Sequence, residues 1–165
     1  MKLSAARYCV FNKTRKSFLA LDVMSADTHL SRLKGLLGTL RLKSDEGIWI
    51  IPSQGIHTVG LRFAIDLIYL DEDYRVIETV ESLGKFRIGP IRMKSASVLE
   101  LPTRTIYASQ TQVGDELLIC LPQEIELKLK NVPSEHSLSE RNDTRGMDDE
   151  RKDEDATSKC ASAEC

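Results

Sequence analysis

Seven consecutive residues in the middle of the chain, 64–70, are apolar at every position except Asp66. Successive side chains of a strand point to opposite faces, so a strand that is apolar on both faces needs cover on both. The segment therefore predicts a central strand of a sheet. Asp66 shares a face with Ala64 and Ile68, where an ionised carboxylate is costly to bury unless hydrogen bonds or an ion pair compensate it.

Shorter apolar segments surround this strand. Alternation and flanking turn residues predict further strands at 8–11, 18–23, 47–52, 75–80, 98–101, 116–121 and 125–129. Leucines at positions 30, 33, 36, 37 and 40 recur at helical spacing and predict one main helix over 28–38. A short helical turn is expected around 103–109. Together these elements predict an α+β fold with a small, mostly antiparallel, barrel-like sheet.

Charge divides the chain into two parts. Residues 1–130 carry 18 Lys and Arg against 15 Asp and Glu, a net charge of +3, whereas residues 131–165 carry 5 against 10, a net charge of −5. After Val132 the only large apolar residues are Leu138 and Met147. Such a segment buries too little surface to offset the entropy lost on ordering it. We therefore expect a folded domain at 5–130 and a disordered acidic tail at 133–165.

The sequence contains no recognisable signal for export or membrane insertion. Residues 1–7 are basic but lack an apolar stretch of signal-peptide length, and no run approaches the roughly 18 apolar residues that a membrane helix needs. Four cysteines are too few for a disulfide scaffold. We therefore expect a cytoplasmic protein with reduced thiols and no membrane partner. Because His136 is the only histidine near Cys160 and Cys165, no metal site is expected.

Familiar catalytic and cofactor motifs are absent. The sequence contains no GxGxxG, GxxxxGK[ST], GxSxG, HExxH or CxxC, so no cofactor is expected. His57 and Thr58 lie in a loop-like segment that leads into the central strand. A general base needs an orienting partner, and a histidine packed in a structural turn is the more frequent outcome. His57 is nevertheless the best single candidate for a ligand-binding residue.

Arg32 and Asp66 are further ligand-binding candidates, together with Thr58 and Trp49. Arg32 shares a helix face with Gly35, past which its guanidinium could reach a buried carboxylate, and Asp66 is the first candidate for that partner. Asp66 either braces the fold or carries function, and we favour bracing.

Two other acidic residues are structural candidates. Glu100 lies in an apolar strand and is a rival partner for Arg32, while Asp115 follows Gly114 in a turn. A separate segment, 85–94, holds four positive charges and a single aromatic residue, Phe86. That is a weak footprint for nucleic acid, so we interpret the segment as a solvated basic loop and do not expect a nucleic-acid partner.

Four short motifs occur in an order that resembles one known family. Arg32-Leu33-Lys34-Gly35-Leu36-Leu37 resembles the R-x-x-G-L-[ML] helix of the domain-of-unknown-function 192 family, and the segment 64–71 resembles its P-L-D-x-x-F-[IL]-D strand. Val98-Leu99-Glu100-Leu101-Pro102 is similar to its V-L-E strand, and Gly114-Asp115-Glu116-Leu117 to its G-D-x-[LIV] ending. The resemblance implies a compact, mostly antiparallel β domain with helical insertions, and it implies no reaction or cofactor.

The resemblance also has a gap. Where many members of the family have W-M-K-N-T, this chain has residues 57–61, and Ala64 replaces the proline of the strand motif. Two hypotheses follow for function. The first is a binding or accessory module without catalytic activity, with a small molecule or a protein as partner and a surface near His57, Arg32, Trp49 and Asp66. The alternative is a small hydrolase-type enzyme in which Asp66 or His57 acts as base and Arg32 holds an anion.

Overall fold

A computed structural model describes residues 6–26 and 41–130 of the 165-residue chain. The predicted helix at 28–38 and the predicted tail at 133–165 lie outside the described residues. The elements are β1 (Arg7–Asn12), β2 (Ser17–Ala26), β3 (Glu46–Ile50), β4 (Ile65–Leu70), β5 (Val76–Leu83), β6 (Ser97–Pro102), α2 (Thr105–Ser109), β7 (Leu117–Cys120), the 3₁₀ turn η1 (Pro122–Glu124) and α3 (Ile125–Lys130).

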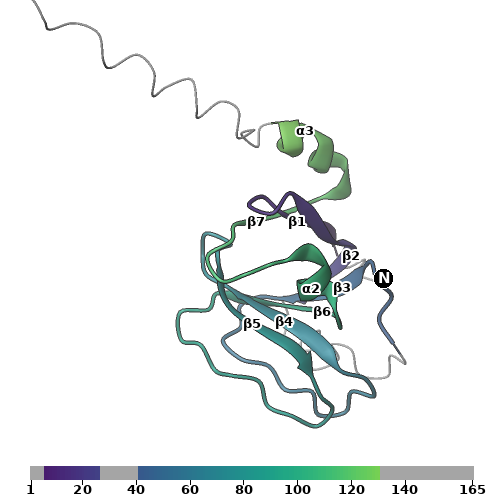
Figure 1. The fold of residues 1–165 in the computed structure, drawn as a ribbon, viewed down its shortest axis with the longest axis vertical. Coiled ribbons are helices and arrows are strands. Elements are labelled where there is room, and N and C mark those ends of the chain that lie inside the picture. The colour runs from purple at the N-terminus through teal and green to yellow at the C-terminus, as the bar shows by residue number, and fades with distance from the viewer. Residues whose placement is uncertain (1–5, 27–40, 131–165) are drawn as a thin grey trace, which may run out of the picture. The chain divides into compact units, whose positions relative to one another are not determined.

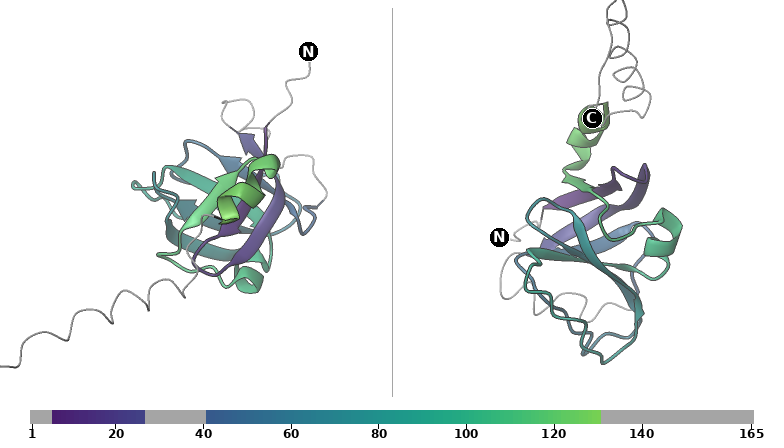
Figure 2. Two further views of the ribbon diagram at one scale, coloured as in Figure 1. Left: turned by 90° about the horizontal axis from the view of Figure 1, so that it is seen from above. Right: turned by 60° about the vertical axis from the view of Figure 1, so that its left-hand side comes forward.

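The strands form one curled sheet in the order β5-β4-β6-β3-β2-β1-β7 (Figures 1 and 2). Every neighbouring pair is antiparallel except β2 and β3, which run parallel. The first residues of β5 approach the chain just before β7, where Arg75 and Glu116 form an isolated antiparallel bridge. The architecture is therefore a half-barrel, mostly of strands, in which the two edges of the sheet approach each other at this corner.

β4 lies inside the sheet, as its sequence predicts, and all six of its residues are buried. Its side chains divide between two apolar clusters. Ile68 and Leu70 pack on the face that α2 covers through Ile106. Leu67 and Tyr69 pack on the opposite face, against Ile56 and other apolar residues. The strand is thus covered on both faces, which explains why its sequence does not alternate between apolar and polar residues.

The predicted final strand at 125–129 is wrong, because this segment is the helix α3. Pro122 occupies the first turn of η1, where a missing backbone N–H costs nothing. Glu124 and Lys128 then form an ion pair at the i,i+4 spacing that stabilises a helix, with a 3.1 Å separation. Alternation of Ile, Leu and Leu with Glu and Lys resembles a strand, but Leu, Glu and Lys are also good helix formers.

Candidate functional site

Asp66 is fully buried and both of its carboxylate oxygens accept backbone hydrogen bonds. The N–H of Ser82 donates to Oδ1 at 2.9 Å, and the N–H of Ile106 donates to Oδ2 at 3.1 Å. Ser82 belongs to an irregularity of β5, where the pairing with β4 shifts register and φ of Ser82 is 52°. Asp66 therefore joins β4 to β5 and to the first turn of α2. The sequence-based pairing with Arg32 concerns a residue outside the described part of the chain.

Trp49 is packed in the core rather than at the mouth of a pocket. Its side chain is buried in the same cluster as Ile68, and its ring makes edge contacts with Tyr8 and Tyr74 at centroid distances of 5.3 and 5.9 Å. Within the described residues, its indole Nε1 has no hydrogen-bond partner. This placement suits an apolar core residue better than a ligand contact.

The two remaining acidic candidates are both buried but differ in their surroundings. Glu100 lies on β6 between Ile48 of β3 and Leu67 of β4, and burial raises the pKa of its carboxyl group to about 7. Burial alone would also raise the pKa of Asp115. There, hydrogen bonds from Asn12, the Gln112 backbone and Arg15 outweigh that effect, so the pKa of Asp115 is lowered. Asp115 is thus an ionised anchor, whereas Glu100 favours its neutral form.

His57 and Thr58, although adjacent, have different surroundings. His57 is exposed, and its backbone pairs with Ile88 across two loops. Thr58 is fully buried; its hydroxyl donates to the Gly84 carbonyl at 2.6 Å and accepts the Arg87 N–H at 2.8 Å. Its backbone N–H also donates to the Arg87 carbonyl at 2.8 Å. Thr58 therefore fastens one loop to the other and is not placed to contact a ligand.

We call the surface formed by residues 54–62 and 84–94 the loop face. Besides Thr58, three contacts hold its second loop in place. The Tyr69 hydroxyl donates to the Pro90 carbonyl at 2.7 Å, and burial raises the pKa of this phenol to about 12. The Gly89 N–H donates to the Ile56 carbonyl at 2.8 Å. Arg92 makes a two-point ion pair with Glu78, with N–O distances of 2.9 and 3.0 Å.

Gly89 is required by this arrangement. A Cβ at position 89 would lie 2.9 Å from the Tyr69 hydroxyl and 3.2 Å from Leu67 Cδ1. Both atoms belong to buried side chains of β4, so neither can move aside without disturbing the core. The loop therefore lies directly on the central strand, and its exposed side chains are carried on a fixed backbone.

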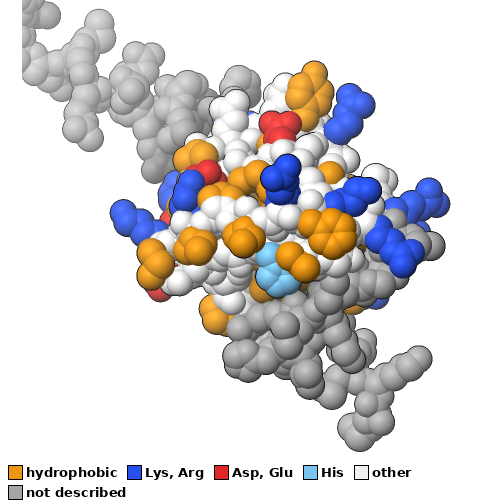
Figure 3. Space-filling view, turned by 90° about the horizontal axis from the view of Figure 1, so that it is seen from below, with side chains coloured by type: hydrophobic (Ala, Val, Ile, Leu, Met, Phe, Trp, Pro, Cys, Tyr) orange, Lys and Arg blue, Asp and Glu red, His pale blue; other side chains and the backbone are white. Residues whose placement is uncertain are grey.

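Large apolar side chains are exposed on the loop face. Five of the eleven exposed large apolar side chains among the described residues belong to it: Val59, Phe86, Ile88, Ile91 and Met93. The most exposed are Ile88 at 77 % and Met93 at 75 %. Figure 3 shows hydrophobic side chains gathered around a histidine on one face of the molecule, with Lys and Arg beside them. A cluster of this kind, rimmed by polar groups, is typical of an interaction surface.

The charge of the loop face has a single sign. Its two segments contain Arg62, Lys85, Arg87, Arg92 and Lys94 but no Asp or Glu, although the whole chain has a net charge of −2. Arg92 is neutralised by Glu78, and the other four cations are exposed. The loop face is therefore apolar and cationic together.

Those ligand-binding candidates that the structure describes do not gather in one place. Asp66 contacts Ile106, which packs on one face of β4, while the loop of His57 packs on the other face through Ile56. His57 and Asp66 are thus separated by the strand between them. Among the described residues, no group of three or more His, Cys, Asp or Glu is placed to hold a metal ion, and no helix is long and apolar enough to cross a membrane.

The sequence interpretation missed the exposed apolar residues. Segment 85–94 was expected to be a solvated basic loop, yet four of its ten residues are large, exposed apolar side chains. The available signal was the alternation of Lys85-Phe86-Arg87-Ile88, which resembles a half-buried strand. Here the alternating backbone pairs with another loop and not with the sheet, so its apolar side chains remain uncovered.

The comparisons with known proteins agree with this fold. No curated protein matches the chain. A protein of unknown function from Novosphingobium aromaticivorans DSM 12444 is structurally similar, with a TM-score of 0.61 and 18 % identity over 72 % of this chain and 89 % of that one. A protein of Sinorhizobium meliloti 1021 described as a “putative transcription regulator” has a TM-score of 0.59 and 19 % identity over 72 % of this chain and 98 % of that one.

At these identities the structural neighbours establish the fold alone. The sequence profile of the DUF192 family, described as “Uncharacterized ACR”, matches residues 10–119, which is most of the chain and nearly all of the described part. All four motifs found in the sequence lie within that range, in the order that the family has them. The chain therefore belongs to the DUF192 family.

Proposed function

We propose that the protein is a binding module without catalytic activity of its own, and that its loop face docks on an acidic surface of another protein. The observation that carries the proposal is a fixed loop backbone that exposes Phe86, Ile88, Ile91 and Met93 among exposed cations. Exposing large apolar side chains to water is unfavourable unless a partner covers them. Holding them on a rigid loop reduces the entropy that binding would cost.

The nature of the partner follows from the charge and side-chain types of the surface. Four exposed cations without a neighbouring carboxylate on the loop face favour an anionic partner. The Sinorhizobium neighbour's description raises DNA as a partner, but aliphatic side chains outnumber the one aromatic on this surface. Aliphatic groups suit a protein interface core, whereas nucleic-acid bases stack on aromatic rings. An acidic protein surface is the better match.

The alternative hypothesis of a small hydrolase gains no support from the described residues. Asp66 has both oxygens occupied by backbone donors and is fully buried, so it is not available as a base. His57 is exposed without Asp66 beside it, and Arg32 lies outside the described residues. The binding hypothesis is therefore preferred.

The cytoplasmic location expected from the sequence belongs to this proposal. Cys9 of β1 and Cys120 of β7 are directly opposite each other in an antiparallel pair, yet both are free thiols. Opposite residues of such a pair lie within the Cα separation that a disulfide spans. We propose that this pair stays reduced in the cytoplasm.

A photo-crosslinking experiment tests the proposal. Benzoylphenylalanine replaces Ile88 in one full-length chain and Leu127, an exposed residue of α3, in a control chain. Proteins crosslinked at position 88 but not at 127 are identified and purified, and their affinities are measured by calorimetry. We expect Ile88→Asp to weaken binding at least about tenfold, because a large aliphatic group is lost from the interface, and Leu127→Asp to leave it unchanged.

Increasing salt is also expected to weaken binding, since the proposal relies on exposed cations. Equal effects of the two substitutions would contradict a docking role for the loop face. The docking role would also be contradicted if the purified chain bound duplex DNA with the same dependence on Ile88 and bound none of the crosslinked proteins.

A further inference from the structure

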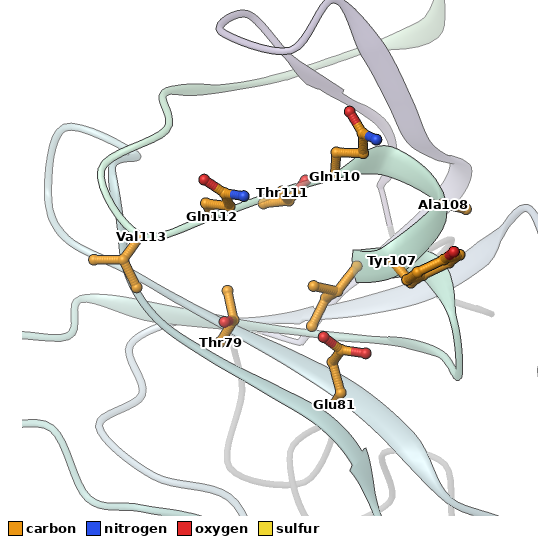
Figure 4. A pocket seen from close by; sticks show the side chains of 9 residues that line it. Thr79, Glu81, Tyr107, Ala108, Gln110, Thr111, Gln112 and Val113 are labelled. Atoms are coloured by element: carbon orange, nitrogen blue, oxygen red, sulfur yellow. The ribbon is translucent and has the colours of Figure 1, made fainter.

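The half-barrel leaves a cavity beside β5 that the loop face does not use. Its volume is about 640 Å³, within the range of ligand sites. Figure 4 shows Thr79 and Glu81 of β5 on one side and Gln110, Thr111 and Gln112 on the other. β5 is the last strand on its side of the sheet, so the cavity lies along a sheet edge.

One end of this edge is already paired. Val76, the first residue of β5, donates its N–H to the Asp115 carbonyl at 2.9 Å, and its carbonyl accepts the Gly114 N–H at 2.8 Å. The chain that precedes Gly114 turns away from β5, with φ of +94° at this glycine. The strand-like pairing between β5 and the segment that contains Gly114 and Asp115 therefore ends at Val76. The cavity occupies the space where a longer pairing partner of β5 would lie.

Hydrogen bonds fix the positions of the two walls of the cavity and so set the distance between them. Asp66 joins Ser82 of β5 to Ile106 of α2, which sets the spacing at the other end. The wall opposite β5 is fixed to β1, because Asn12 donates to Thr111 Oγ1 at 3.0 Å and to Asp115 Oδ2 at 2.9 Å. The cavity is thus part of the folded structure and does not need a ligand to form.

We propose that this cavity binds an extended peptide segment, which pairs with β5 and continues the pairing that Gly114 and Asp115 begin. The unpaired edge of a strand offers alternating N–H and carbonyl groups, and another extended backbone is their natural complement. Such a segment would cover Tyr107 and Val113, which line the cavity with exposed fractions of 70 % and 62 %.

The lining also specifies the side chains of the peptide. Glu81 is the one charged residue among those that line the cavity, and the others are mostly small, polar or amide-bearing. A Lys or Arg opposite Glu81 would therefore be favoured. This site is separate from the loop face, so the proposal does not depend on the proposed function.

The test uses the full-length chain and a phage-displayed library of random heptapeptides. Enriched peptides are synthesised in two forms, one unmodified and one N-methylated at alternate residues, which blocks strand pairing without changing the side chains. Affinities are measured by calorimetry, and protection of backbone amides in β5 is measured by hydrogen exchange. We expect a basic residue at one fixed position, protection within 77–83, and a loss of binding of at least tenfold on N-methylation.

Matched variants locate the site. Glu81→Gln is expected to weaken the binding of the enriched peptides about tenfold. Glu126→Gln, which removes an exposed carboxylate on α3, and Ile88→Asp on the loop face should leave their affinity unchanged. A library without enriched peptides, equal binding of the N-methylated forms, or equal effects of Glu81→Gln and Glu126→Gln would each overturn the proposal.

Discussion

The carboxylate of Asp66, on β4, accepts the backbone N–H of Ile106 at 3.1 Å, at the start of α2. Arg104, which precedes this helix, has φ of 73° and makes no side-chain capping hydrogen bond. Asp66 thus satisfies a donor in the helix's first turn, a task that a capping residue usually performs. A residue far away in sequence fixes α2 over the core.

The first prediction concerns substitutions of Asp66. Asp66→Ala leaves the N–H groups of Ser82 and Ile106 buried without an acceptor, so it should lower the free energy of unfolding by about 3 to 5 kcal/mol. Asp66→Asn retains one acceptor oxygen and should cost roughly half as much. Urea denaturation of both variants measures the difference. Equal losses would mean that the negative charge itself, paired with a cation, provides the stabilisation.

Asp66 illustrates what sequence reasoning could and could not predict. A single carboxylate in an apolar segment indicates burial with compensating donors or in the neutral form, because an ionised carboxylate without partners carries a large desolvation cost. Which donors compensate it depends on how β5 and α2 fold around it, and Ile106 is 40 residues away. The strand was therefore predictable from local pattern, but its hydrogen-bond partners were not.

The alternation at 85–88 was a local signal for the loop face, but it could not show whether the apolar side chains would be covered. Residues 84–94 lack regular secondary structure, so no periodicity relates their side chains to the core. Thr58 and Tyr69 determine which side chains of this loop are exposed to solvent, because they hydrogen-bond to Gly84 and Pro90. These contacts join residues 26 and 21 positions apart, and turn or strand patterns carry no information about them.

The second prediction tests the role of Thr58 in holding this loop. Thr58→Val keeps the shape of the side chain but removes the hydroxyl that contacts the Gly84 carbonyl and the Arg87 N–H. We expect a loss of about 1 to 3 kcal/mol and faster hydrogen exchange at the Arg87 amide. Thr58→Ser retains the hydroxyl and serves as the control. If valine destabilises the protein no more than serine, the hydroxyl contributes no more than the methyl group does, and its role in holding the loop is contradicted.

The third prediction concerns the reactivity of Cys9 and Cys120. Burial raises the pKa of both thiols, and the carboxylate of Asp22 adds to the effect at Cys9. Because the thiolate is the reactive form, both cysteines should react at least about tenfold more slowly with Ellman's reagent than an exposed thiol. The measurement uses a chain with Cys160→Ser and Cys165→Ser, in native buffer and in urea. Rapid reaction in native buffer would show that β1 and β7 separate readily.

The last prediction concerns Glu100 and the pH dependence of stability. Its pKa is about 7 in the folded protein, above its ordinary value of 4.5, so the folded state holds a proton that the unfolded state loses between these values. This contribution to stability is fully present below pH 4.5 and is lost as pH rises through 7. Glu100→Gln removes the titrating group. Relative to this variant, the wild-type free energy of unfolding should decline by about 3 kcal/mol from pH 4.5 to pH 7.

Urea denaturation across this pH range gives the difference directly, and Glu126→Gln, at an exposed position, is the matched control that should run parallel to the wild type. A pH-independent difference between wild type and Glu100→Gln would mean that the pKa of Glu100 is the same in the folded and the unfolded protein. A cation or hydrogen-bond donors would then have to offset the burial of this carboxylate between Ile48 and Leu67.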